Sequence, residues 1–159
     1  MRGIQMTADE FVEQIGNTAG MVCANYNLPA SVCIAQAAIE SEWGRYCIGN
    51  YNYFGRKWGG WGNYVEKSTQ EYNPESGYYD TTAKFQDYDS LEDAIKDWCE
   101  LMTEEPAYSE ALETWHNTWD VEEFVRAMAP VYATDPDYAD KIISTIRANG
   151  LMRFDGWDD

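Results

Sequence analysis

Apolar side chains recur at helical spacing through the first part of the chain and predict two consecutive helices. The first helix is expected to begin at Thr7, because Thr7 and Glu10 form a capping-box pair that satisfies free backbone amides of a first turn. The Asn-Leu-Pro sequence at residues 27–29 ends this helix. A second helix is expected over residues 30–42, with apolar side chains in nearly every direction around its axis. A helix that is apolar on all sides lies buried at the centre of a fold.

Two acids near the end of this central helix carry the candidate chemistry, and one polar residue precedes them. Gln36 lies one turn before Glu40, and Glu42 follows just before Trp43 and Gly44 end the helix. An aromatic loop containing several glycines comes next. A carboxyl group at the end of a buried helix, beside aromatic surface, would be desolvated and held in its protonated, proton-donating form. Helical phase alone leaves open which of the two acids faces a cleft.

The rest of the chain predicts a β-hairpin followed by further helices. Two strands are expected at residues 64–72 and 78–85, joined by a turn of Asn-Pro-Glu-Ser-Gly. Further helices are expected over residues 90–102, 109–115 and 121–128, the last of them closed before Pro130. Asp135 is expected to cap a final helix that ends near residue 149. The pattern predicts a mainly α fold with a small β-hairpin lobe (α+β), in one domain over residues 1–159 with a loose acidic tail at 152–159.

Charge and composition narrow the classes of partner. The chain has 28 acidic and 11 basic residues and a net charge of −17, which excludes a nucleic-acid surface and an anionic membrane surface. No apolar run is long enough to cross a membrane, so no membrane insertion is expected. Aromatic residues make up 15% of the chain. This fraction suits a groove that stacks on sugar rings, although core packing accounts for several of the aromatic side chains.

The cysteines indicate no metal site. Cys23, Cys33, Cys47 and Cys99 have neither CxxC nor histidine-paired spacing, so no metal and no other cofactor is expected. Four buried free thiols in a reducing compartment are expected, and a Cys23–Cys33 bridge stays open. The first residues lack the apolar segment of a secretory signal, so we expect synthesis in the cytoplasm without a signal peptide.

Four stretches in order, the first of them in two parts, resemble the peptidoglycan glucosaminidases of the flagellar-rod and autolysin type, glycoside hydrolase family 73. The sequence AQAAIESEWG at residues 35–44, followed by NYNYFGRK at 50–57, is similar to that family's A-Q-x-x-x-E-S-x-W-G and N-x-F-G-x-K. The segments at 65–72, ending TQEY, at 85–90, and at 132–142, reading YATDPDYADKI, resemble later family motifs. The resemblance covers about residues 11–151.

This resemblance implies a lysozyme-like fold with the hairpin lobe over a cleft. It implies hydrolysis of the β-1,4 bond from N-acetylglucosamine to N-acetylmuramic acid in bacterial peptidoglycan, without a metal. The family's general acid falls on Glu40, its β-lobe acid on Glu71 and its tyrosine on Tyr132. The loop at residues 56–63 is richer in tryptophan than the family pattern, so contacts near Glu71 are expected to differ.

The role of Glu71 leaves two mechanisms open. At roughly 6.5–9.5 Å from Glu40 it would act as the base of an inverting reaction. Farther away, the 2-acetamido group of the substrate would attack instead, with Tyr132 or Glu71 orienting the acetamido group or the water. The expected substrate-binding residues are Trp43, Asn52, Phe54 and Tyr138.

Other specificities and settings remain as alternatives. The same scaffold would suit a muramidase or a lytic transglycosylase, and a non-catalytic glycan-binding module is a rival of another class. We expect a monomer that acts at the bacterial cell wall, as a phage endolysin or tail lysin, with a bacterial autolysin as the second setting.

Overall fold

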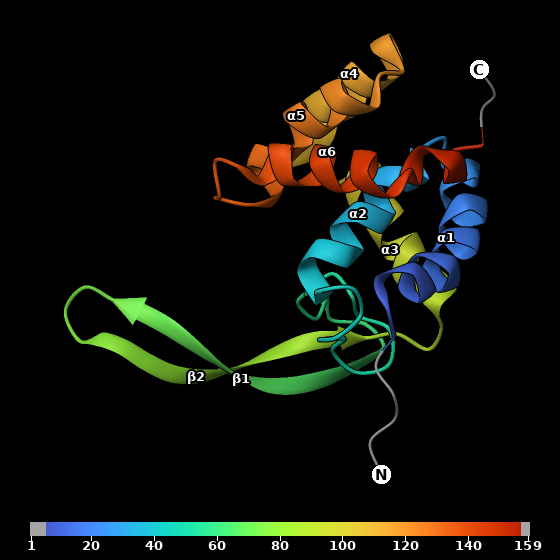
Figure 1. Ribbon diagram of the computed structural model, residues 1–159. Helices are drawn as coiled ribbons and strands as arrows, with labels where there is room; N and C mark the ends of the chain where they lie inside the picture. The colour runs from blue at the N-terminus through green and yellow to red at the C-terminus, as the bar shows by residue number, and fades with distance from the viewer. Residues whose placement is uncertain (1–5, 157–159) are drawn as a thin grey trace.

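The computed structural model describes residues 6–156, and within them the predicted mainly α fold with a β-hairpin lobe is confirmed (Figure 1). The elements, in order, are α1 (Ala8–Asn25), α2 (Ala30–Ser41), β1 (Asn63–Asn73), β2 (Gly77–Asp87), α3 (Leu91–Glu104), the 3-10 helix η1 (Pro106–Tyr108), α4 (Ser109–Thr118), α5 (Val121–Tyr132), α6 (Tyr138–Asn149) and the 3-10 helix η2 (Leu151–Phe154). None of the helices in this described part is long and apolar enough to cross a membrane.

Helix α2 is the centre of the helical body, as its apolar pattern predicts. Every residue from Ala30 to Ala38 is buried, and α1, α6 and η2 all pack against this helix (Figure 1). The predicted capping box of α1 is present, because the backbone amides of Thr7 and Glu10 each donate to the other residue's side chain at 3.0 and 3.1 Å. The core therefore forms around the helix that ends in the candidate acid.

Ser41 and Gly44 end α2 immediately after Glu40. The hydroxyl of Ser41 donates to the carbonyl of Ala37 at 2.7 Å and accepts from the backbone amide of Gly44 at 2.7 Å. Gly44 has a φ of 84°, and a Cβ placed there would lie 2.8 Å from the ring of Phe11. Ser41 is thus a structural residue, and only glycine fits the turn that directs the chain away from the helix.

The hairpin of β1 and β2 is a twisted two-stranded ribbon that projects beyond the helices (Figure 1). Its register pairs Asn63 with Asp87 at the base and Asn73 with Gly77 at the tip. A short segment before β1 pairs with the base of β2. The backbone amide of Trp58 donates to the carbonyl of Lys84 at 2.9 Å, and the backbone amide of Gln86 donates to the carbonyl of Arg56 at 3.0 Å. This pairing fixes the base of the hairpin to the loop that leads away from α2.

Several helix boundaries differ from the sequence prediction, and the contacts explain two of the differences. Pro130 does not close α5, which continues to Tyr132, because a proline in the last turn removes only one backbone hydrogen bond. Helix α6 begins at Tyr138, so the predicted cap at Asp135 is wrong. The carboxylate of Asp135 instead accepts from the backbone amide of Asp137 at 2.9 Å and pairs with Lys141, and so holds the turn that precedes the helix.

The predicted loose tail is wrong as far as Asp155. Residues 151–154 form η2, and Phe154 packs so closely on α1 that a Cβ at Gly16 would lie 2.3 Å from its ring. Asp155 is buried and bonds to Ser31, in the first turn of α2. The segment is ordered because it supplies the cap that the start of α2, at Pro29, does not have. Residues 157–159 lie outside the described part of the chain.

The four cysteines are free thiols, as expected, but only three are buried. Cys47 is half-buried in the loop after α2. The Cys23–Cys33 bridge that the sequence left open does not form, and the Sγ of Cys23 lies 3.7 Å from that of Cys99. Among residues 6–156, no group of three potential metal ligands comes together.

Candidate active site

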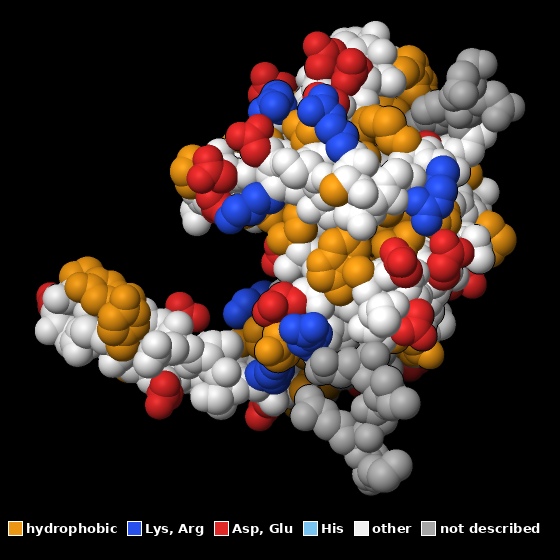
Figure 2. Space-filling model, viewed as in Figure 1, with side chains coloured by type: hydrophobic (Ala, Val, Ile, Leu, Met, Phe, Trp, Pro, Cys, Tyr) orange, Lys and Arg blue, Asp and Glu red, His pale blue; other side chains and the backbone are white. Residues whose placement is uncertain are grey.

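Glu40 lines a pocket of about 310 Å³ at the end of α2. The lining residues are Glu40, Phe54, Gly55, Arg56, Lys57, Leu101, Tyr108 and Tyr132. Figure 2 shows the molecule deeply hollowed between the projecting hairpin and the helices above it, and α2 ends beside this hollow. The expected burial of Glu40 is wrong, since its side chain is exposed where α2 leaves the core. The carboxylate is instead accessible from the open side of the molecule.

Tyr138 holds the carboxylate of Glu40 from the protein side. Its hydroxyl donates to Oε2 of Glu40 at 2.8 Å and accepts from Nε2 of Gln36 at 3.2 Å. Burial raises the pKa of Tyr138 well above its ordinary value, and the nearby charge of Glu40 acts in the same direction. The hydroxyl therefore keeps its proton and remains a hydrogen-bond donor at every pH at which enzymes work. Tyr138 was expected as a substrate-binding residue, and the structure shows it as a direct partner of the acid.

Tyr132 lies beside the same acid and stacks on Tyr138. The two rings are 5.8 Å apart and nearly parallel, at 11°. The hydroxyl of Tyr132 donates to the carbonyl of Phe54 at 3.3 Å. Burial raises the pKa of Tyr132 above its usual range, with the charge of Glu40 as the next cause. Glu40, Phe54, Tyr132 and Tyr138, all expected from the sequence, thus meet in one place.

Two cations complete the pocket, and neither was singled out from the sequence. The guanidinium of Arg56 lies 3.3 Å from Oδ2 of Asp97, which also accepts a hydrogen bond from Tyr88. The ammonium of Lys57 lies 4.8 Å above the ring of Phe85. Both residues directly follow the Phe-Gly of the family-like motif at residues 50–57. Their position next to Phe54 in the sequence could therefore have predicted that they line the pocket.

Asn52 and Trp43 lie outside the lining of this pocket. The Asn52 amide nitrogen donates to the carbonyls of Arg56 and Gln86, both at 2.9 Å. Its oxygen accepts from the backbone amides of Phe54 and Arg56 at 3.3 and 3.0 Å. Asn52 is buried and organises the loop that presents Phe54, a role that the expected sugar contact did not include. Trp43 packs edge-on against Phe11, with ring centroids 6.3 Å apart.

Glu71 lies near the tip of the hairpin, away from the pocket. It is exposed, pairs with Tyr79 across the sheet, and accepts a long bond of 3.5 Å from Thr69. The backbone of the pocket residue Lys57 pairs with that of Phe85 in β2, and Phe85 lies opposite Val65 in β1. Glu71 lies six residues beyond Val65 along the same strand. At the rise of a β-strand those residues span about 20 Å. The structure therefore does not bring Glu71 together with Glu40.

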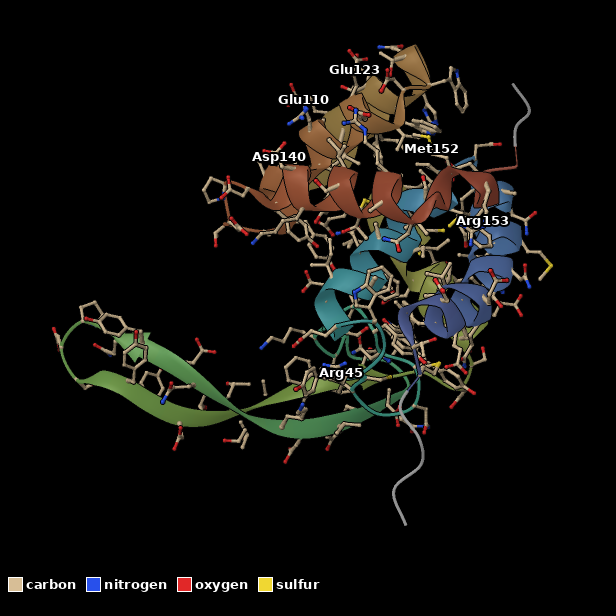
Figure 3. The ribbon with its side chains drawn as sticks, in the orientation of Figure 1. Arg45, Glu110, Glu123, Asp140, Met152 and Arg153 are labelled. Carbon is tan, nitrogen blue, oxygen red and sulfur yellow. The ribbon has the colours of Figure 1, made fainter. Side chains whose placement is uncertain are left out.

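A larger cavity, of about 620 Å³, lies at the other end of the molecule. Glu123 and Met152, two of its lining residues, are labelled in Figure 3 far from the hairpin. Two of its charged groups pair with residues outside its lining: Glu122 pairs with Arg147, and Arg126 lies 3.2 Å from Asp140. It contains none of the candidate residues, so the smaller pocket at Glu40 is the candidate active site.

Three kinds of comparison identify the family of the chain. A family model for glucosaminidases, described as mannosyl-glycoprotein endo-beta-N-acetylglucosaminidase, matches residues 16–151. The exo-glucosaminidase LytG of Bacillus subtilis (strain 168) is 30% identical over 153 residues, which are 91% of this chain and 52% of LytG. The peptidoglycan hydrolase FlgJ of Escherichia coli (strain K12) is 35% identical over 147 residues, 86% of this chain and 45% of FlgJ. The chain thus spans about half the length of these two curated relatives.

Solved structures share the fold. The catalytic domain of the autolysin Auto from Listeria monocytogenes superposes with a TM-score of 0.84 at 31% identity, over 98% of this chain and 91% of that one. The glycoside hydrolase domain of FlgJ from Salmonella typhimurium gives a TM-score of 0.73 at 29% identity, over 93% and 91% of the two chains. The lysozyme-like α+β fold implied by the sequence motifs is therefore confirmed. The chain belongs to the glucosaminidase family of glycoside hydrolases, family 73.

Proposed function

We propose that the chain is a peptidoglycan hydrolase that cleaves the β-1,4 bond from N-acetylglucosamine to N-acetylmuramic acid within glycan strands, with Glu40 as general acid. The observation that carries the proposal is the carboxyl group of Glu40, open to the cleft on one side and bonded to Tyr138 on the other. The relatives named as peptidoglycan hydrolases and as an exo-glucosaminidase support this substrate and bond.

Peptidoglycan is preferred to the mannosyl glycoprotein of the family description. Lys57, and Arg56 with its partner Asp97, place cations beside Glu40 in a chain whose net charge is −17. Muramic acid carries a lactyl group and acidic peptides, whereas the core of a mannosyl glycoprotein is neutral. Cations at this place favour the anionic polymer, because the rest of the surface would repel it. The hollow in Figure 2 is open at the side, which suits an endo-acting enzyme on a long strand.

The distance of Glu71 favours the substrate-assisted mechanism. Glu40 donates its proton to the glycosidic oxygen as the bond to C1 breaks, and the carbonyl oxygen of the 2-acetamido group attacks C1 to form an oxazolinium ion. Water then attacks C1, the bond to the acetamido oxygen breaks, and Glu40 takes the proton from the water. The anomeric configuration is retained. We infer that Tyr132, beside Glu40 in the pocket, orients the acetamido group.

Digestion of purified peptidoglycan tests the proposal. Reduction with sodium borohydride marks new reducing ends for mass spectrometry, and reduced N-acetylglucosamine ends are the expected product. Reduced muramic ends would assign a muramidase, and anhydro ends a transglycosylase. Absence of cleavage across several wall types, with binding retained, would favour a glycan-binding module. A Glu40→Gln variant as active as the wild type would overturn the assignment of the acid.

The biological setting of the chain stays a prediction. A phage endolysin is expected to lyse a bacterial host when it is co-expressed with a holin, and to leave the host intact without one. A monomer is expected to elute at the mass of one chain, 18.2 kDa, in size-exclusion chromatography with light scattering.

A further inference from the structure

A continuous chain of hydrogen bonds runs from the core to the carboxylate of Glu40. The indole Nε1 of Trp98 donates to Oε1 of Gln36 at 2.6 Å. Nε2 of Gln36 donates to the hydroxyl of Tyr138 at 3.2 Å, and that hydroxyl donates to Oε2 of Glu40 at 2.8 Å. Trp98, Gln36 and Tyr138 are buried and belong to α3, α2 and α6. The chain of bonds therefore joins three helices behind the pocket.

Trp98 fixes the direction of every bond in this chain. An indole N–H can only donate, so it draws the carbonyl oxygen of Gln36 toward itself and leaves the amide nitrogen facing Tyr138. An amide nitrogen also only donates, so the hydroxyl oxygen of Tyr138 has to accept. The single proton of that hydroxyl is then directed to Oε2 of Glu40.

We propose that Gln36 and Trp98 are positioning residues that decide which oxygen of Glu40 carries the catalytic proton. Because Oε2 accepts from Tyr138, the proton of the neutral acid resides on Oε1, the oxygen left free for the leaving glycosidic oxygen. If the Gln36 amide were reversed, its carbonyl would accept the Tyr138 proton. Tyr138 would then accept from Glu40, whose proton would face the protein instead of the sugar. This inference rests on the proposed role of Glu40 as general acid.

The surroundings of Gln36 argue against a role in packing alone. From Val32 to Ile39 the other residues of α2 are valine, cysteine, isoleucine and alanine. A buried amide contributes to stability only while all its partners are present, and it costs free energy when one is lost. In the described part of the chain, no buried side-chain nitrogen or oxygen lacks a partner. An apolar residue would pack here without that requirement, so the amide is explained by the hydroxyl that it orients.

The test uses Trp98→Phe, with Trp115→Phe as its matched control. Both tryptophans are fully buried and donate through Nε1, but Trp115 donates to the backbone carbonyl of Asn27, outside the chain of bonds. Both variants lose an indole and one hydrogen bond, so both are expected to lose stability. Only Trp98→Phe frees the Gln36 amide to reverse. The substrates are oligosaccharides of alternating N-acetylglucosamine and N-acetylmuramic acid.

We expect Trp98→Phe to lower kcat by about tenfold or more with little change in KM. A misdirected proton weakens stabilisation of the transition state and leaves binding of the substrate unchanged. We also expect its pH–rate profile to differ from that of the wild type, because the carboxylate of Glu40 loses the donor that fixes its proton. Trp115→Phe is expected to keep the wild-type profile. Identical profiles in the two variants would overturn the proposal.

Tyr138→Phe provides a second, independent test, since it removes the donor to Glu40 itself. If Trp98 acts through Tyr138, the double variant has the kcat and pH profile of Tyr138→Phe alone. Effects that multiply in the double variant would overturn the proposal, because they would mean that Trp98 acts by another route.

NMR of the Gln36 side-chain amide separates this proposal from the proposed function. In the wild type, the amide protons of Gln36 are expected to show nuclear Overhauser contacts to the ring of Tyr138. These contacts are expected to be lost in Trp98→Phe and kept in Trp115→Phe, whether or not a glycan is cleaved. A wild type that cleaves no glycan would overturn the proposed function, and the amide contacts would still decide the positioning role. An active wild type with the same contacts in both variants would overturn the positioning role alone.

Discussion

Asp155 caps the central helix from the far end of the chain. Its two carboxylate oxygens accept from the backbone amide of Ser31 at 2.7 Å and from the Ser31 hydroxyl at 2.8 Å. Helix α2 has Pro29 at its N-cap and no capping side chain of its own, so this long-range bond replaces a local one. The helix that presents Glu40 is thereby anchored at its start by η2.

This cap predicts an unusual dependence of stability on pH. Burial raises the pKa of Asp155 from its ordinary 3.8 to about 6, although the bonds to Ser31 act in the opposite direction. The folded state therefore binds the proton more tightly than the unfolded state. The contribution of Asp155 to the free energy of unfolding is therefore complete below pH 4 and is lost as pH rises through 6. The change is about 2–3 kcal/mol.

Asp155→Asn isolates that contribution. An asparagine oxygen still accepts from the Ser31 amide, and its nitrogen donates to the Ser31 hydroxyl, but it does not titrate. Urea unfolding of both proteins between pH 4 and pH 7 is expected to show the wild type losing stability relative to the variant as pH rises. A difference that stays constant over this range would contradict the assigned pKa.

Glu40→Gln is expected to abolish cleavage without unfolding the protein. Loss of a general acid costs roughly 10²–10⁴ in rate. The side chain is exposed, and a glutamine oxygen can still accept from Tyr138, so the melting temperature should change little. The control is Glu42→Gln, at the exposed left-handed position that ends the helix. Release of reducing ends by the two variants measures the contrast, and equal losses in both would argue against Glu40 as the acid.

The local part of this site was predictable from the sequence, and the long-range part was not. The buried, apolar pattern of α2 and its abrupt end place Glu40 at the edge of the core, and both features are local. Gln36 is visible in the pattern as a polar exception. Its partners Trp98 and Tyr138 lie 62 and 102 residues away, so only the packing of three helices brings them to it.

The same division explains the errors. Strand pattern predicts the hairpin and places Glu71 on its first strand, but the direction in which the ribbon leaves the body depends on the pairing of residues 56–58 with β2. Asn52 lies in a family-like motif, yet its four hydrogen bonds to the backbone are visible only in the folded loop. Residues 152–159 were predicted to be loose because nothing in their acidic sequence indicates that Asp155 is buried and caps the helix at Ser31.

Glu71→Gln distinguishes the two mechanisms. If the acetamido group of the substrate is the nucleophile, this variant is expected to retain activity within about tenfold, because Glu71 lies on the order of 20 Å from the pocket. Proton NMR of the first product should show a retained β anomer. Inversion, together with a loss as large as that of Glu40→Gln, would show instead that the hairpin closes and brings Glu71 to the reaction as a base.

Gly44→Ala is expected to weaken the turn that ends α2. An alanine there suffers twice, from a φ of 84° and from a Cβ that would lie 2.8 Å from the buried ring of Phe11. Gly60→Ala is the matched control, because Gly60 has a φ of 90° but no atom within 4 Å of the added carbon. We expect Gly60→Ala to cost about 1 kcal/mol of unfolding free energy and Gly44→Ala 1–3 kcal/mol more. Urea denaturation of both variants measures the difference, and equal losses would mean that Phe11 moves aside freely.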